Sequence, residues 1–164
     1  PPRDLRRIAF AFPEEKIRTE LPAKDRDFQT HIVDEEVARK LGRSDTRYAF
    51  DSEADYYDDL ARARFGITTK RDGWDCMRHY EIAANAAVPC FRDLHRKPDT
   101  NAPHGLIDGV NCIAYRSYGE LKRRTAALDD AAYARLQQGA LDWARANSTR
   151  ARAAELLAAM GFAP

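Results

Sequence analysis

The chain has 164 residues, of which 44% are hydrophobic and 32% are charged, a composition typical of a globular domain large enough to have its own core. Its 27 basic and 26 acidic residues leave a formal net charge of +1, so no global field attracts the chain to nucleic acid or to a membrane surface. No apolar run is long enough for a transmembrane segment and no signal peptide is visible, so we expect one domain over residues 1–164, located in the cytoplasm.

The first fifty residues predict three short strands, and their pattern is less regular than that of the later chain. Residues 6–12 are rich in apolar and aromatic side chains and predict the first strand. The charged stretch 14–27 has no clear period and indicates a loop. Residues 28–33 predict a second strand and residues 47–50 a third. Between these two, residues 34–41 predict a helix, because an aspartate stands at the N-cap position and a glycine follows the last residue.

The centre of the chain predicts helix, strand, loop, helix and strand in succession. Ser52 begins a helix with a near-capping-box start, and residues 65–69 then form a short β-branched and aromatic strand. The charged residues 70–73 predict a loop. From Trp74 onward apolar residues recur at helical spacing, and residues 87–91 return to strand. The members of the apolar stripe are Trp74, Met77, Tyr80 and Ala84. Two strands joined by a helix of this length form a right-handed, parallel βαβ unit.

The last seventy residues predict a long loop, one strand and three helices. Residues 94–109 hold two prolines, two glycines and two histidines and indicate a loop of the length that often carries function. Residues 111–115 predict a strand, and a capping box at residues 117–120 opens a helix to about Leu128. A further helix begins at Asp129 or Asp130 and a last one after Ser148. These elements together predict an α/β, Rossmann-like domain with a mostly parallel sheet flanked by helices.

The start of the helix after residue 73 is a candidate anion site. A helix that follows a parallel strand directs its free N–H groups and positive dipole end toward the carboxyl edge of the sheet, where open α/β folds bind anions. Thr68, Thr69, Lys70 and Arg71 flank this helix start and all can bind phosphate oxygens. Glu81, one or two turns further on, adds a carboxylate that could accept from ribose hydroxyls. The alternative interpretation is a solvated basic loop with a surface glutamate.

At these residues the sequence resembles a known family. The segment GWDCMRHYEIAANAAVPCFRDL is similar to the second-lobe motif of two-lobed GT-B glycosyltransferases, including the exostosin-like, family 1 and family 4 types. There a helix carries a glutamate followed by small residues, then a glycine, a proline and a strand. In this chain Glu81 is the glutamate, Ala83 and Ala84 are the small residues, and Pro89 is the proline. The likeness extends from about residue 52 to the C-terminus.

Two departures from the family pattern concern the site itself. The glycine that usually precedes the strand is replaced by Ala86 or Ala87. The first acidic residue of the paired-glutamate motif falls at Gly73, so its role is empty or passes to Asp72 or Asp75.

The resemblance implies a single GT-B lobe that binds a nucleotide-diphosphate-sugar donor and takes part in sugar transfer to an acceptor. It implies that Glu81 binds the donor ribose and that the preceding loop faces the diphosphate and the sugar. The implied substrate-binding residues are Thr68, Thr69, Lys70, Arg71, Asp72, Gly73, Trp74, Asp75, Arg78 and Glu81. No metal and no cofactor are implied, because basic side chains and a helix start neutralise the leaving diphosphate. The acceptor-binding lobe and the catalytic residues, which remain unidentified, would come from a second lobe or a partner chain.

Other chemistry and other classes of protein remain open at this level. The cysteines at 76, 90 and 112 show no metal-binding or disulfide spacing, so we expect free thiols, and the histidines do not fall at metal-ligand spacing. At the long loop, Asp93, His95, Asp99 and His104 form either a carboxylate–imidazole cluster or an ordinary solvated loop. The alternative functions are a non-catalytic module that binds a nucleotide or a protein, and a purely structural domain.

Overall fold

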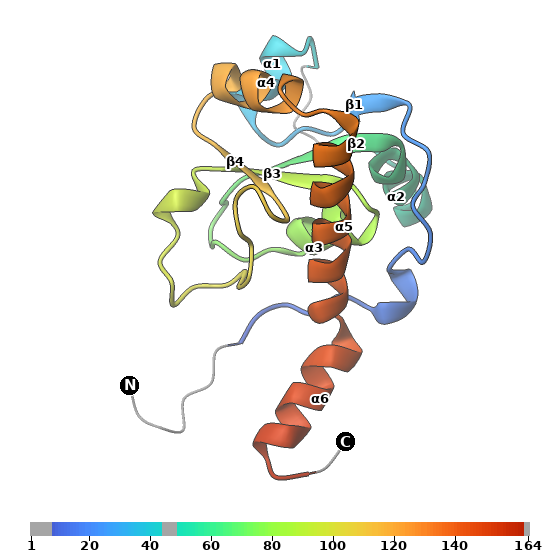
Figure 1. Cartoon of the computed structure of the whole chain (residues 1–164), viewed down its shortest axis with the longest axis vertical. Coiled ribbons are helices and arrows are strands. Elements are labelled where there is room, and N and C mark those ends of the chain that lie inside the picture. Colours follow the sequence, from blue (N-terminus) through green and yellow to red (C-terminus); the bar gives the residue numbers. More distant parts are fainter. Residues whose placement is uncertain (1–7, 44–48, 163–164) are drawn as a thin grey trace.

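The computed structural model describes residues 8–43 and 49–162 and shows an α/β fold around one sheet (Figure 1). Its four strands are all parallel and follow the order β1-β2-β3-β4. The strands are β1 (Arg26–Phe28), β2 (Ala63–Thr68), β3 (Val88–Arg92) and β4 (Ile113–Tyr115). The predicted Rossmann-like arrangement of a parallel sheet flanked by helices is therefore confirmed.

Helices connect the strands and continue beyond the last one. The helical segments are η1 (Glu14–Lys16), α1 (Glu35–Lys40), α2 (Glu53–Arg62), α3 (Met77–Ala84), η2 (Leu94–Arg96), α4 (Tyr118–Ala126), α5 (Asp130–Ala146) and α6 (Thr149–Ala159). Arg116 and Ser117 connect β4 to α4, and α6 projects away from the body of the domain (Figure 1). No residue of α6 is buried.

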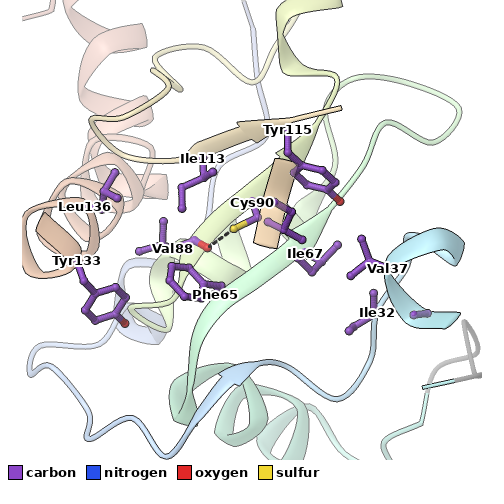
Figure 2. Packing of buried hydrophobic residues seen from close by; sticks show 12 residues of the cluster. Ile32, Val37, Phe65, Ile67, Val88, Cys90, Ile113, Tyr115, Tyr133 and Leu136 are labelled. Atoms are coloured by element: carbon purple, nitrogen blue, oxygen red, sulfur yellow. Dashed lines mark hydrogen bonds between the residues drawn. The ribbon is translucent and has the colours of Figure 1, made fainter. Parts of the chain in front are cut away.

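The two faces of the sheet are packed differently. On one face, Phe65, Val88 and Ile113 from neighbouring strands join the side chains of α1, α4 and the first half of α5 in the main core (Figure 2). On the other face, α3 approaches β2 so closely that a Cβ atom at Gly66 would lie 2.4 Å from Cγ2 of Ile82. Glycine is therefore required at this position of the strand, and the close packing fixes α3 against the sheet.

Helix α5 closes the amino edge of the sheet. Its Gln137 side chain donates to the carbonyl of Ala86, just before β3, at 3.0 Å. Two residues further on, a Cβ atom at Gly139 would lie 2.3 Å from the carbonyl oxygen of Val110, just before β4. Because the amino edge is covered in this way, the carboxyl edge is the side at which the sheet is available for a ligand.

The second predicted strand is shorter than expected and lies earlier in the chain. Residues 28–33 were expected to be extended throughout, but β1 ends at Phe28. The reason is a side chain: the Gln29 amide accepts from the Ile67 N–H at 2.8 Å and donates to the Ile67 carbonyl at 3.1 Å. It takes the place of the next backbone pair of the ladder, so the chain can turn away from the sheet without leaving Ile67 unpaired.

The other two strands expected in the first fifty residues are not found among the described residues. Of residues 6–12, the first two lie outside the described part, and the rest form no strand apart from one isolated bridge between Phe12 and Ser148. That bridge ties the N-terminal segment to the start of α6 and not to the sheet. Of residues 47–50, the first two lie outside the described part and the last two form no strand.

Helix α3 begins three residues later than predicted. Trp74 was expected to open its apolar stripe, but the helix starts at Met77 after an extended Cys76. Trp74 instead remains in the loop and packs against Phe91 of β3, with ring centroids 6.2 Å apart. The Trp74 carbonyl lies 2.9 Å from His79 Nε2, so a side chain binds it in place of the helix ladder.

Candidate functional site

A pocket of about 330 Å³ lies at the carboxyl ends of β2 and β3. Its lining residues come from the loop after β2 and from the segment that ends β3 and enters η2. They are Thr69, Lys70, Trp74, Arg92, Asp93 and Arg96. We call this hollow the strand-end pocket. It lies at the carboxyl edge of the sheet, the edge at which open α/β folds bind ligands.

Positive charge dominates the strand-end pocket. Among the described residues, no carboxylate lies within ion-pair distance of Lys70 or Arg96, both of which are exposed. Lys70 Nζ lies 6.0 Å from the centroid of the Trp74 ring. Asp93 contributes one carboxylate and adopts a left-handed backbone with φ 57°, which turns the chain sharply from β3 into η2. The net charge of the lining favours an anionic ligand.

The third cation, Arg92, is held by two carboxylates. Its Nη1 donates to both oxygens of Asp34 at 2.9 and 2.8 Å, and its Nη2 lies 2.9 Å from Glu36 Oε2. Asp34 is buried, caps α1 by accepting from the N–H groups of the next turn, and also accepts from the Tyr115 hydroxyl at 2.7 Å. These partners raise the pKa of Arg92 against the opposing effect of its burial. The guanidinium is therefore fixed in position, and much of its charge is already balanced.

A buried histidine attaches the pocket loop to the sheet. His79 Nε2 lies 2.9 Å from the Trp74 carbonyl oxygen, and its Nδ1 lies 2.8 Å from Thr68 Oγ1. A carbonyl oxygen only accepts, so Nε2 carries the proton and Nδ1 accepts from the Thr68 hydroxyl. The ring also stacks on Phe91 with centroids 4.6 Å apart. The Thr68 hydroxyl is therefore engaged in the fold.

Cys76, the thiol nearest to this histidine, is not activated by it. Its Sγ lies 3.4 Å from His79 Nε2, but that nitrogen donates to Trp74 and burial raises the pKa of the thiol. Cys76, Cys90 and Cys112 are free. Within the described residues, no group of three or more His, Cys, Asp or Glu side chains is placed to hold a metal ion.

The remaining residues of the predicted loop do not line the strand-end pocket. Arg71, Asp72 and Gly73 are exposed and do not line the strand-end pocket. Asp75 accepts from the backbone N–H of Phe10 and from the Tyr80 hydroxyl, each at 2.9 Å. It therefore joins the N-terminal segment to α3.

Arg78 and Glu81 lie on α3 and outside the strand-end pocket. Arg78 is partly buried, and its Nη1 has no hydrogen-bond partner among the described residues. Glu81 is half-buried and accepts from the Tyr56 hydroxyl of α2 at 3.3 Å. Burial raises the pKa of its carboxyl, against the lowering effect of the Tyr56 hydrogen bond and of nearby Arg78. No ion pair within 4 Å joins Glu81 to a described basic residue.

The sequence analysis missed Arg92, Arg96 and the Asp34 cluster. Arg92 and Arg96 could have been found, because they follow the second strand of the predicted βαβ unit and parallel strands place their carboxyl ends together. Asp34 was correctly predicted as a helix cap, but its contact with Arg92, 58 positions away, has no local signal.

Comparisons with known proteins add no assignment. No protein-family model matches the chain, and no curated protein is significantly similar to it. Among the helices of the described residues, none is both long and apolar enough to cross a membrane.

Proposed function

We propose that the chain is the donor-binding lobe of a glycosyltransferase and binds a nucleotide-diphosphate-sugar. The proposal draws on the resemblance around Glu81 and on the α/β fold, in which ligands bind at the carboxyl edge of the sheet. The observation that carries it is the strand-end pocket, because it brings an unpaired lysine and an unpaired arginine to that edge.

In this proposal the diphosphate lies in the strand-end pocket. Lys70, from the loop after β2, and Arg96, from η2, donate to its oxygens, while Arg92 adds positive charge that Asp34 and Glu36 partly balance. Thr69 adds a hydroxyl. The same charges would stabilise the nucleoside diphosphate as it leaves during sugar transfer. The residues that bind the acceptor and deprotonate it belong, in this proposal, to a second lobe or a partner chain.

Replacing both Lys70 and Arg96 by alanine should weaken binding of a nucleoside diphosphate about tenfold at low salt, because two charge-assisted contacts are lost. The loss should shrink as salt rises, because the contacts are exposed and screened. Titration calorimetry with UDP and GDP at two salt concentrations measures this. Arg71→Ala is the matched control, because Arg71 is exposed and adjacent in the chain but does not line the pocket. Equal losses in the control and the double variant would place the anion elsewhere.

The same titrations separate the proposed function from its alternatives. Binding together with release or transfer of sugar from a nucleotide-sugar, once a second lobe is supplied, supports the enzyme. Binding without any transfer supports a nucleotide-binding module. No binding of any nucleotide would leave a structural domain or a protein-binding module.

Glu81 is proposed to bind the donor ribose. It lies four residues into α3, about 6 Å along the helix axis from its start, and its carboxylate is partly desolvated without an ion pair. Among the described residues, this carboxylate accepts a side-chain hydrogen bond only from Tyr56. Two ribose hydroxyls would supply further donors.

Glu81→Gln should therefore weaken nucleotide binding about ten- to a hundredfold, since hydrogen bonds to a charged acceptor contribute roughly 1.5–3 kcal/mol. The same substitution should not lower the free energy of unfolding. A raised pKa means that the folded state disfavours the carboxylate, so its contribution to stability falls as the pH rises through the folded pKa. At pH 7 the glutamine should leave the free energy of unfolding unchanged or higher. Calorimetric affinity and urea unfolding of the one variant decide: lower stability with unchanged affinity would make Glu81 structural.

A further inference from the structure

A second hollow, like the strand-end pocket, is lined in part by residues of η2. Arg96 lines the strand-end pocket, whereas Leu94 and His95 line the second hollow. The second hollow has a volume of about 500 Å³, and its opposite wall is formed by residues 103–107. We call it the loop hollow. The two spaces adjoin along the chain, because Arg96, which lines the strand-end pocket, stands between His95 and Lys97, which line the loop hollow.

The far wall of the loop hollow is held in place by side chains from outside it. Trp143 Nε1 of α5 donates to the His104 carbonyl at 2.7 Å. The buried Asn111 side chain donates to the Gly105 carbonyl at 2.8 Å and accepts from the Ile107 N–H at 2.7 Å. Both contacts bind backbone groups, so they fix the course of the chain. The hollow is thus formed before any ligand arrives, which lowers the entropy lost on binding.

The near wall is stabilised in a similar way. Lys97 Nζ donates to the carbonyls of Pro98 and Asn101 at 3.2 and 2.6 Å, which closes the turn that carries Asp99. His95 and Asp99 are exposed and line the hollow, and the buried Leu94 contributes apolar surface. A carboxylate, an imidazole and an apolar surface together suit a polyhydroxylated ring, which offers hydroxyl groups at its rim and C–H groups on its faces.

We propose that the loop hollow binds the sugar of the donor, with His95 and Asp99 as its hydroxyl-binding residues. This inference rests on the proposed function, because it assigns the neighbouring strand-end pocket to the diphosphate. A ligand in which a polar ring is linked directly to a diphosphate matches two adjoining spaces, one cationic and one with a carboxylate and an imidazole. The carboxylate of Asp99 accepts from two hydroxyls, and His95 donates or accepts according to its tautomer.

The quantity that tests this is the ratio of two dissociation constants, that of a nucleoside diphosphate and that of its sugar conjugate. The pairs UDP with UDP-glucose, UDP with UDP-N-acetylglucosamine, and GDP with GDP-mannose are titrated against the full chain. For a pair in which the sugar conjugate binds more tightly, Asp99→Asn should reduce that advantage about tenfold, and His95→Ala about threefold, because a charged acceptor contributes more than a neutral group. Neither variant should change the affinity for the nucleoside diphosphate alone.

Glu15→Gln provides a matched control, because it removes one exposed carboxylate on η1, away from the loop hollow. Thermal unfolding checks that the loop variants keep the wild-type stability, as expected for exposed side chains. If both loop variants left the ratio of dissociation constants unchanged, this inference would be overturned and the proposed function would stand. An equal loss of affinity for the nucleoside diphosphate and for its sugar conjugate would have the same meaning. Failure of the wild type to bind any nucleotide would overturn the proposed function and this inference together.

Discussion

The Asp34→Ala variant should lose about 3–5 kcal/mol of the free energy of unfolding, the range found when one partner of a buried ion pair is removed. Asp34 is 4% exposed and is bound by Arg92, by the Tyr115 hydroxyl and by the first N–H groups of α1. Alanine would remove the helix cap, leave the Tyr115 hydroxyl buried without its acceptor, and deprive Arg92 of its main counter-ion. Urea unfolding with an unchanged m-value would measure the loss.

Two companion variants resolve the origin of that loss. Tyr115→Phe removes only the hydroxyl and should lower stability by about 1 kcal/mol, the net contribution of one hydrogen bond. Asp34→Asn keeps an oxygen for the helix cap but removes the charge that faces Arg92, so its stability should lie between those of Tyr115→Phe and Asp34→Ala. A loss below 1 kcal/mol for Asp34→Ala would show that solvent replaces Asp34 as the partner of Arg92, which is 28% exposed.

Only part of the candidate site could be predicted from the sequence. Thr69, Lys70 and Trp74 were predicted from the loop before α3, and all three line the strand-end pocket. Their neighbours Arg92 and Arg96 reach the pocket through the parallel pairing of β2 with β3, in which Thr68 lies opposite Phe91. The strand order fixes this pairing, and periodicity alone does not specify strand order.

Local chemistry was the most predictable part of the fold. Each helix for which a capping residue was proposed begins directly after a proposed cap, because a cap is a contact within three or four positions of the chain. The side chains that accept these hydrogen bonds are those of Asp34, Ser52, Ser117, Asp129 and Ser148. The errors arose where a distant contact replaced a local one, as when the Gln29 amide ended β1 by pairing with Ile67.

The three-residue error at the start of α3 has the same origin. The spacing of Trp74 and Met77 fits a helix, but the Trp74 carbonyl is bound by the ring of His79 and its side chain packs on β3. Helical geometry would have used that carbonyl for the helix ladder. A single buried imidazole therefore decides where the pocket loop ends and where the helix begins.

That imidazole should make the domain sensitive to mild acid. Burial lowers the pKa of His79 to about 4 from an ordinary value of 6.5, because the cation would lose its hydration and the Trp74 carbonyl and nearby Asp75 offset only part of that loss. Above pH 6.5 the ring is neutral in both the folded and the unfolded chain and adds no pH dependence. Between pH 6.5 and about 4 only the unfolded chain takes up the proton, so the free energy of unfolding falls as the pH falls. At 1.36 kcal/mol per pH unit, the full loss is about 3 kcal/mol.

A variant that keeps the contacts of His79 without its titration isolates this effect from that of the carboxylates. In His79→Gln the amide can donate to the Trp74 carbonyl and accept from the Thr68 hydroxyl, but it cannot take up a proton. The variant should be less stable than the wild type at pH 7, because it loses the stacking on Phe91. Its stability should nevertheless decline less between pH 6.5 and 4.5, the interval in which urea unfolding of the two proteins is compared. Parallel curves would mean that His79 is protonated as readily in the folded chain as in the unfolded one.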